Sequence, residues 1–402
     1  MSRPPASLLS VEDARAAMLA WAPPAPSQTV ALADAVGRTL AEDIHAIRDQ
    51  PPYPASAMDG WAAAAADIPG RLRIAGESAA GTPYAGALQR GEAVRIFTGA
   101  ALPPGADTVV IQEVARRDGG TVELPPTPLG QFVRPAGCDF RGGERLLSRG
   151  IKLDAWRLSL AAAGGRGELT VAQRPRVSFL STGEEIIDPG SEPGPYQIFD
   201  AGTVALVALA GRWGAAATRL RPVGDDIAAT AEAVRETDCD LIVTVGGASV
   251  GDHDLVKPAL AQLGLELAVE SVNVRPGKPT WFGRLADGRR VLGLPGNPSS
   301  ALVCAELFLH PLLQAMQGAD ATPRLVWARA AAAFPANGAR EHWMRARITS
   351  GLDGALSAEA FADQDSSLVS VFASADALVR RAAGAAALEA GGLVEALLLE
   401  RA

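Results

Sequence analysis

The segment DLIVTVGGASVGD, residues 240–252, decides the fold class of this chain. Its run of apolar and β-branched residues, 241–245, predicts a buried strand, and the glycines that follow end the strand in a loop. The residues after this loop, Asp254–Leu263, are expected to form a helix. A strand, a glycine-rich loop and a helix in this order are typical of α/β proteins with a parallel sheet.

The same order recurs on both sides of this segment. Val177–Leu180 is expected to be a strand that ends in STGEE, residues 181–185, and Val291–Leu294 one that leads into LPGNPSS, residues 294–300. Further elements are expected around them, namely helices Thr203–Trp213, Ile227–Glu236 and Ser299–Met316 and strands Thr218–Pro222, Leu265–Asn273 and Thr280–Arg284. The alternation predicts an α/β domain with a mostly parallel sheet over residues 174–318.

The flanking regions have a different pattern of apolar and turn-forming residues. Residues 49–142 contain short apolar runs separated by glycine and proline turns, which predicts a β-rich domain. We expect this domain to be inserted into a discontinuous N-terminal α/β domain built from residues 1–48 and 143–173. Short strands predict a C-terminal β domain over residues 319–402, and the alanine-rich stretch 62–66 is expected to be helical.

The composition argues against several classes of protein. The 402 residues carry a net charge of −8, whereas general nucleic-acid binding requires a basic surface. Cys138, Cys239 and Cys304 are odd in number and far apart, which argues against a disulfide framework or a zinc site. The sequence lacks the ~18 consecutive apolar residues of a membrane helix and the apolar core of a signal peptide. We therefore expect a cytoplasmic protein without membrane or nucleic-acid partners.

Three strand ends carry the expected binding chemistry. The carboxyl ends of parallel strands meet at one edge of a sheet, where ligands of α/β proteins bind. Glycines let the backbone approach a ligand closely, and helix N-termini offer free N–H groups to anions. The three loops therefore predict a site for a phosphate-bearing ligand, with these candidate binding residues: Ser181, Thr182, Gly183, Gly247, Ser249, Gly251, Asp252, Pro295, Gly296, Asn297, Pro298 and Ser299.

Carboxylates accompany the loops, and two interpretations of them stay open. They are Glu184, Glu185, Asp225, Asp226, Asp252 and Asp254. Hard oxygen ligands beside phosphates suit Mg²⁺, but Asp225, Asp226 and Asp252 also stand where helix N-caps are expected. Glu185 and Asp254 are the better candidates for metal ligands, and a structural role is favoured for His253.

The segment RPGKP, residues 275–279, places two cations on a loop stiffened by prolines. Such a loop could hold an oxyanion at little ordering cost. Taken alone, it is better interpreted as a solvated basic turn.

Six segments in register resemble one known family. They are SAMDG (56–60), RIFTGA (95–100), STGEE (181–185), GASVGDHD (247–254), RPGKP (275–279) and LPGNP (294–298). Together they make the chain similar to MoeA-type molybdopterin molybdenumtransferases, a family that includes the E domain of gephyrin. The likeness runs in order from about residue 10 to the C-terminus.

The resemblance implies a fold and an activity. Four domains are implied, of which the central one is a three-layer α/β domain similar to molybdopterin adenylyltransferases and the last a small β-barrel. The family forms elongated homodimers with the site between subunits. The implied reaction inserts molybdate into adenylylated molybdopterin, releases AMP and is assisted by Mg²⁺ as cofactor.

The resemblance also implies roles for single residues. Asp59 and Thr98 would line the site from the partner subunit, and the implied catalytic carboxylates are Asp59, Glu185, Asp226 and Asp254, with Mg²⁺ on Glu185 and Asp254. Molybdate would be held by Arg275, Lys278, Arg345, Ser366 and Ser367. Two departures stand out: Arg275 replaces the family's usual lysine, and Asp200-Ala201-Gly202 replaces its Asp-Ser/Thr-Asn.

Two other functions compete with this interpretation. The chain could retain molybdopterin adenylyltransferase activity, although that reaction does not need the flanking β domains. It could also be a gephyrin-like scaffold, although the sequence has no long disordered linker. A separate molybdopterin adenylyltransferase is an expected docking partner.

Overall fold

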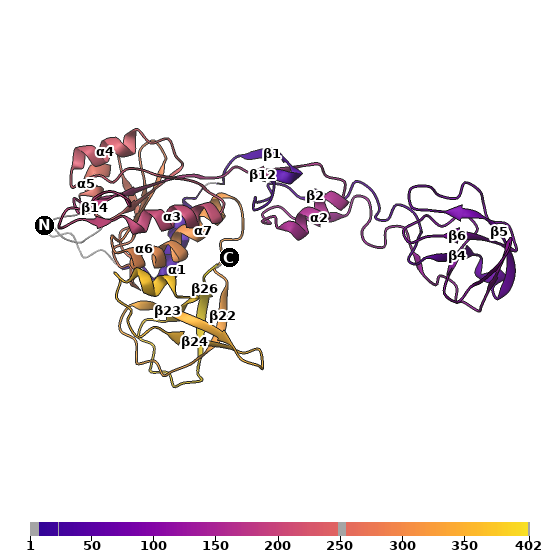
Figure 1. Ribbon diagram of the computed structural model, residues 1–402. Helices are drawn as coiled ribbons and strands as arrows, with labels where there is room; N and C mark the ends of the chain where they lie inside the picture. Colours follow the sequence, from indigo (N-terminus) through magenta and orange to yellow (C-terminus); the bar gives the residue numbers. More distant parts are fainter. Residues whose placement is uncertain (1–7, 23, 248–254, 401–402) are drawn as a thin grey trace.

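The computed structural model describes residues 8–22, 24–247 and 255–400. The chain forms an elongated, bent molecule with three lobes (Figure 1). At one end an α/β lobe lies beside the C-terminal strands. A small middle lobe follows, and a β-rich lobe forms the far end.

A six-stranded sheet forms the centre of the α/β lobe. Its strands are, in spatial order, β16 (Ala216–Arg219), β13 (Arg176–Ser181), β17 (Leu241–Val245), β21 (Arg290–Leu294), β20 (Trp281–Arg284) and β18 (Glu266–Val269). The first four run parallel, whereas β20 and β18 are antiparallel to their neighbours. The prediction of a mostly parallel sheet is therefore confirmed, with the strand expected at 218–222 shifted to 216–219.

Helices cover both faces of this sheet and give the lobe three layers. One face packs against α1 (Val11–Ala20), α3 (Ala201–Arg212) and the helix of residues 298–316, and the other against α4 (Ile227–Arg235) and α5 (Val256–Ala261). Strand β17 shows why both faces can be covered: Leu241 and Val243 pack into the first core, and Ile242 packs into the second.

The helix of residues 298–316 is continuous but not uniform. It consists of α6 (Pro298–Cys304), a π-helical turn (Ala305–Leu309) and α7 (His310–Met316). It is long and apolar enough to span a membrane, yet 89% of its most apolar stretch is buried inside the molecule. Its composition therefore reflects its place in the core of the α/β lobe.

Two separate parts of the chain build the middle lobe. They pair through β1 (Ser27–Ala31) with β12 (Glu168–Ala172) and β2 (Ile44–His45) with β11 (Arg145–Leu147), beside α2 (Ala155–Ala163) and the short 3₁₀ helix Leu32–Asp34. Helix α2 ends at Gly164 and Gly165, and Gly165 has a φ of 88°, which suits glycine after a helix end.

The intervening chain forms the β-rich lobe. Its sheet has the order β7 (Thr108–Ile111), β4 (Gly60–Ala63), β6 (Glu92–Ile96), β5 (Gly70–Ser78), β9 (Thr121–Leu124) and β8 (Arg116–Asp118), and β3 (Ala55–Ser56) pairs separately with β10 (Val133–Arg134). The helix expected over 62–66 is wrong. Residues 60–63 are a strand between β6 and β7, and only Ala65–Asp67 form a 3₁₀ turn.

The C-terminal strands close into a barrel, as the resemblance implied. Its strands are β22 (Leu325–Ala330), β23 (Glu341–Ser350), β24 (Leu356–Ala360), β25 (Ala377–Arg381) and β26 (Leu393–Leu398), with α8 (Val369–Ala373) in one connection. Closure follows because β23 pairs with both β24 and β25. The short strand β19 (Val274–Arg275) leaves the α/β lobe and pairs in parallel with β23, which fixes the barrel against that lobe.

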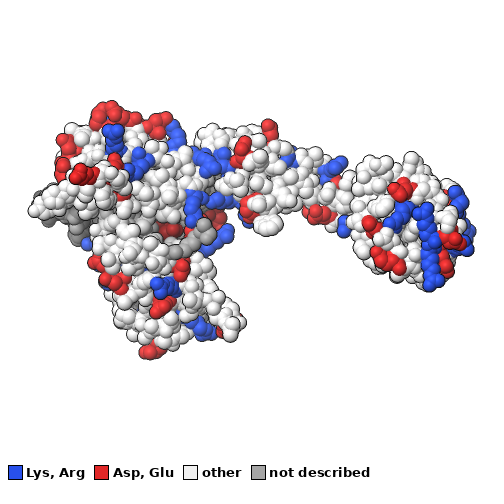
Figure 2. All heavy atoms as spheres, viewed as in Figure 1, with Lys and Arg blue, Asp and Glu red and all other residues white. Residues whose placement is uncertain are grey.

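Charges are mixed over the face shown in Figure 2, where basic side chains on the β-rich lobe lie among acidic ones. Within this lobe, Arg71 forms an ion pair with Asp118, Arg73 with Glu92 and Arg90 with Asp67.

Candidate functional site

The three glycine-rich loops meet at the carboxyl edge of the sheet. A Cβ added to Gly246 would lie 2.6 Å from the carbonyl oxygen of Thr182, and one added to Gly296 would lie 3.3 Å from the Cα of Gly246. Only glycine lets the backbones approach so closely, and Gly246 also has a φ of 99°. The expectation that STGEE, the loop after β17 and LPGNPSS collect at one place is confirmed.

An unsatisfied polar atom lies where these loops meet. The Thr182 hydroxyl is buried and has no hydrogen-bond partner among the described residues, and a Cβ on Gly247 would come within 3.2 Å of it. Buried hydroxyls are normally hydrogen-bonded, so this hydroxyl is a candidate contact for a ligand. The neighbouring Ser181 differs, because its hydroxyl already donates to Asp200 Oδ2 at 2.8 Å.

Asp200 organises the start of α3. Its Oδ1 accepts the backbone N–H of Thr203 at 3.0 Å, and its Oδ2 accepts Arg219 Nη2 at 2.9 Å. Burial alone would raise the pKa of this carboxyl, but hydrogen bonds from Thr203, Ser181 and Arg219 outweigh it and hold the pKa below its usual value. Asp200 of the Asp200-Ala201-Gly202 segment is therefore a charged, buried N-cap of α3.

Some carboxylates of the loops accept backbone hydrogen bonds, whereas Glu185 does not. Asp226 is the N-cap of α4, since its Oδ1 accepts the N–H of Ala229 at 2.9 Å, and Glu184 Oε1 accepts the N–H of Asp225 at 3.1 Å. The capping interpretation is thus confirmed for Asp226. Glu185 is exposed and its carboxylate has no hydrogen bond within the described ranges.

Several predicted residues lie outside the described residues. They are Ser249, Gly251, Asp252, His253 and Asp254. Within the described part of the chain, no three His, Cys, Asp or Glu residues cluster closely enough to hold a metal ion.

The RPGKP loop lies against the buried start of the 298–316 helix. Gly277, with a φ of 115°, packs so tightly that a Cβ there would lie 2.1 Å from the Cys304 sulfur. The side chains of Arg275 and Lys278 are exposed, and neither forms an ion pair or hydrogen bond with any residue that the structure describes. The loop therefore presents two unpaired cations on a rigid base.

Arg345 adds a third cation from strand β23. It is fully buried, its Nε donates to Gln364 Oε1 at 3.1 Å, and its Nη1 donates to the carbonyl of Asp365 at 2.9 Å. Its Nη2 is buried and has no partner among the described residues. The guanidinium thus keeps an unused N–H donor that is enclosed by the protein in this structure.

The loop 364–368 of the barrel lies against the N-terminus of α6. Asn297 Nδ2 donates to the Ser366 hydroxyl at 2.7 Å, and the Ser299 N–H donates to the Ser366 carbonyl at 3.1 Å. Ser367 instead donates its hydroxyl to Asp365 at 2.6 Å. The LPGNPSS loop and the predicted serine segment are therefore brought together.

Sequence reasoning missed Gln364 and His342. Gln364 Oε1 also accepts the backbone N–H of Arg345 at 2.9 Å, and His342 lies opposite Arg275 in the β19–β23 pairing. Burial and then the charges of Arg275, Arg345 and Arg340 lower the pKa of His342 to about 4, which keeps it neutral at physiological pH. The strand pairing that places His342 here has no local signal in the sequence.

Asp59 and Thr98 form a small unit of their own in the β-rich lobe. Asp59 Oδ1 accepts both the N–H and the hydroxyl of Thr98 at 2.8 Å. These bonds, led by the one from the Thr98 N–H, lower the pKa of Asp59. Figure 1 shows this lobe at the opposite end of the chain from the glycine-rich loops, so one chain does not bring Asp59 to them.

Comparison with known proteins agrees with this arrangement. Residues 9–165 match the MoeA N-terminal region (domains I and II), residues 178–315 a probable molybdopterin-binding domain, and residues 327–399 the MoeA C-terminal region (domain IV). A molybdopterin molybdenumtransferase from Nostoc sp. is 36% identical over 73% of this chain and 70% of its own length. This chain belongs to the molybdopterin molybdenumtransferase family.

Two further relatives cover nearly the whole chain. Molybdopterin molybdenumtransferase 1 of Mycobacterium tuberculosis is 30% identical over 97% of this chain and 99% of its own length. The crystal structure of a molybdopterin biosynthesis MoeA protein from Pyrococcus horikoshii superposes with a TM-score of 0.84 at 29% identity, covering 98% of this chain and all of the other. The matched regions follow one another in family order along this chain, and the fold class implied by the resemblance is confirmed.

Proposed function

We propose that the protein inserts molybdate into adenylylated molybdopterin, releasing AMP and leaving molybdenum on the dithiolene sulfurs. The observation that supports this most is the set of three cations, Arg275, Lys278 and Arg345, around loops suited to a phosphate ligand. Molybdate is a doubly charged oxyanion, and several fixed cations with hydroxyl donors offset the cost of removing it from water. Ser366, next to the Asp365 carbonyl that accepts from Arg345, would supply a hydroxyl donor.

The glycine-rich loops would hold the adenylylated pterin. The Thr182 hydroxyl, which has no partner among the described residues, and the N–H groups of Gly247 and Gly296 would offer donors to a phosphate. The N-terminus of α6 would add the N–H of Ser300, because Pro298 has no N–H and the Ser299 N–H donates to the Ser366 carbonyl. This placement puts the phosphoanhydride at the sheet edge and the molybdate on the neighbouring RPGKP loop. The two substrates would thus meet without a large movement of either loop.

We propose Glu185 and Asp254 as ligands of Mg²⁺. The Glu185 carboxylate is free of hydrogen bonds within the described residues, which fits a metal that takes one or two protein carboxylates and otherwise waters and phosphates. When bound, the ion would polarise the phosphoanhydride and offset charge on the leaving AMP. Asp226 would act alongside through the carboxylate oxygen that does not cap α4.

We also propose that the site is completed by a second copy of the chain, giving a homodimer. The Asp59–Thr98 unit is ordered by its own hydrogen bonds and is distant from the loops of its own chain. A lowered pKa keeps Asp59 anionic at neutral pH. Its partly exposed position would let it contact a partner's loops.

We propose four domains. Residues 1–48 and 143–173 together form the first, 49–142 the second, 174–318 the third and 319–402 the fourth. We also propose that the protein is cytoplasmic and that it docks a molybdopterin adenylyltransferase. The pairing of β1 with β12 and of β2 with β11 supports the discontinuous first domain. The adenylyltransferase would make the adenylylated pterin that this protein uses. Direct transfer would protect this labile molecule from water, which supports the proposed docking.

Lys278→Ala tests the molybdate assignment. We expect the molybdate concentration for half-maximal insertion to rise at least about tenfold, because one of three cations around the oxyanion is lost. Binding of the adenylylated pterin, measured by titration without molybdate, should change little. Arg235→Ala removes an exposed cation on α4 and serves as the control. Normal insertion by Lys278→Ala at limiting molybdate would contradict the assignment.

A further inference from the structure

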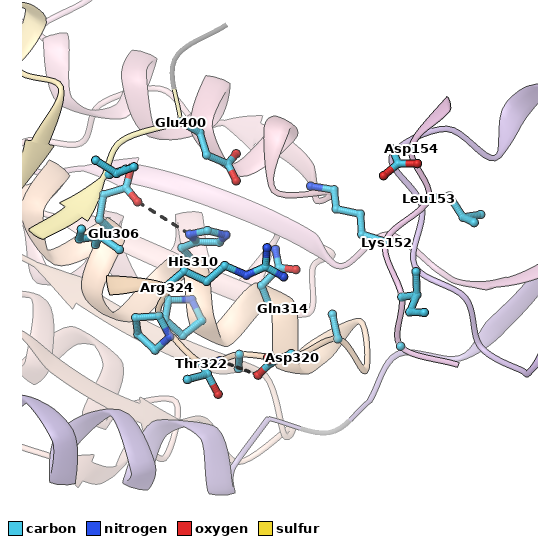
Figure 3. A pocket seen from close by; sticks show the side chains of 18 of the residues that line it. Lys152, Leu153, Asp154, Glu306, His310, Gln314, Asp320, Thr322, Arg324 and Glu400 are labelled. Carbon is cyan, nitrogen blue, oxygen red and sulfur yellow. Dashed lines mark hydrogen bonds and ion pairs between the residues drawn. The ribbon is translucent and has the colours of Figure 1, made fainter. Parts of the chain in front are cut away.

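A cavity of about 700 Å³ lies where the middle lobe, the α/β lobe and the barrel meet. It is lined by the loop before α2, the C-terminal half of the 298–316 helix, the linker 319–324 and the end of β26 (Figure 3). The helix begins at the candidate molybdate site and reaches this cavity only two turns later. The cavity is therefore distinct from the site described above.

Polar side chains project from one face of this otherwise apolar helix into the cavity. They are Glu306, His310 and Gln314, each four residues from the next (Figure 3). The Glu306 side chain is only 8% exposed, and its one interaction with a described residue is with His310 Nδ1 at 3.8 Å. That distance is too long for a hydrogen bond. Glu306 is thus a buried carboxylate in need of donors.

The backbone and the aromatic packing hold this row of side chains in place. Glu306 lies in the π-helical turn Ala305–Leu309, a distortion that occurs often at functional sites. The His310 ring stacks on Trp213 with a centroid distance of 4.6 Å and an angle of 6°. Gln314 Nε2 donates to the Trp213 carbonyl at 3.3 Å. The floor of the cavity is therefore preformed.

Cations lie at the opening of the cavity. Lys152 extends from the middle lobe, with its Nζ 3.1 Å from the Arg212 carbonyl, and Arg324 reaches across toward the helix (Figure 3). Arg324 is exposed and has no hydrogen bond or ion pair with any described residue. Glu400 and Asp320 also line the opening, and Asp320 is engaged by the N–H of Thr322 at 2.9 Å.

We propose that this cavity binds a small anionic heterocycle with a 2-amino-4-oxopyrimidine edge, the chemistry shared by guanine nucleotides and anionic pterins. The ring N–H and the amino group of that edge are adjacent donors, which matches the two oxygens of Glu306. The anionic group would lie on Arg324 and Lys152. Leu153, Pro311 and other apolar side chains would flank the ring, and the volume is within the usual range for such ligands.

Binding of defined probes to the full-length protein tests this. In calorimetric titrations without molybdate, GMP should bind at least about tenfold more tightly than IMP, which differs only in lacking the 2-amino group. Pterin-6-carboxylate, followed by its fluorescence anisotropy, distinguishes the two sources of the edge. Pterin binding counts toward this cavity only where Glu306→Gln weakens it, because the glycine-rich loops are the proposed site of the adenylylated pterin. Binding of GMP alone identifies a guanine nucleotide, binding of both identifies the shared edge, and binding of the pterin without GMP overturns the proposal.

Two variants locate the binding. Glu306→Gln replaces one acceptor by a donor and should abolish the preference for GMP over IMP. Arg324→Ala alters an exposed side chain and should weaken GMP and IMP equally by about tenfold, whereas Arg329→Ala on β22 should weaken neither. Equal binding of GMP and IMP to the unaltered protein, or an unchanged preference in Glu306→Gln, overturns the proposal. Neither result depends on molybdate insertion, so the proposed activity is tested separately.

Discussion

Arg345 is fully buried, which is rare for an arginine, and its surroundings explain what it can bind. Burial lowers its pKa, and the nearby charges of Asp363 and Asp365 oppose this. The group nevertheless stays cationic at neutral pH, because the ordinary pKa of a guanidinium is far above 7. A buried cation whose Nη2 has no described partner is stabilised when an oxyanion accepts from it.

Gln364 is the residue that orients this cation, and two substitutions separate its roles. Gln364→Ala removes the acceptor of two buried N–H groups and should lower the free energy of unfolding by about 1–3 kcal/mol, measured by urea denaturation. Gln364→Glu keeps the acceptor and neutralises Arg345, but it replaces the amide donor to the carbonyls of Arg345 and Phe361 by an oxygen. We therefore expect a similar loss of stability, together with a molybdate requirement raised about tenfold that Gln364→Ala does not show. An unchanged molybdate requirement in Gln364→Glu would remove Arg345 from the oxyanion site.

The strands and helices of the α/β lobe were predictable because their signals are local. The apolar run Leu241–Val245 is buried along its whole length, and the glycines after it end the strand where expected. The stretch Ala62–Ala66 was predicted wrongly, because alanine favours a helix intrinsically while pairing with β6 and β7 places Ala62 and Ala63 in a sheet. Long-range pairing overrides a weak local preference.

The loops of the site were predictable from the sequence, but the residues packed around them, Gln364 and His342, were not. The glycines, the RPGKP cations and Arg345 belong to recognisable sequence motifs. Gln364 and His342 act through a barrel strand and its neighbours, and their places depend on the β19–β23 pairing of segments far apart in sequence. Such contacts have no spacing rule that one sequence can reveal.

At the N-terminus of α4, Asp226 combines a cap with a proposed phosphate or metal role, and two substitutions distinguish these. Asp226→Ala should lower the free energy of unfolding by about 1 kcal/mol, since the bond to the Ala229 N–H is lost. Asp226→Asn preserves the cap, because Asn caps as well as Asp. We expect Asp226→Asn to unfold like the unaltered protein and to insert molybdenum more slowly. A normal rate of molybdenum insertion in Asp226→Asn would show that the residue acts only as a helix cap.

The whole molecule separates the two halves of the proposed site. The Asp59–Thr98 unit lies in the β-rich lobe, and the glycine-rich loops lie beyond the middle lobe at the other end of the chain (Figure 1). A two-fold homodimer with the chains running in opposite directions would place each β-rich lobe beside the partner's loops. In that proposed assembly, the length of the chain would bring the two halves of the site together.

Mixed dimers test this shared site directly. Asp59→Asn and Glu185→Gln proteins should each be nearly inactive, and random mixing should restore about a quarter of the unaltered rate. Half of the dimers would then be mixed, and each mixed dimer would contain one intact site, with Asp59 from one chain and Glu185 from the other. If each chain formed its own site, every chain would carry a defect and mixing would restore nothing.

The reciprocal mixture is the matched control. A chain carrying both substitutions, mixed with an equal amount of unaltered chain, should retain only about a quarter of the full rate, because each mixed dimer would then have two defective sites. Sites confined to single chains would instead retain about half, since every unaltered chain would stay active. Comparing the two mixtures separates the arrangement of the site from any loss of stability, because both contain the same substitutions in the same total amount.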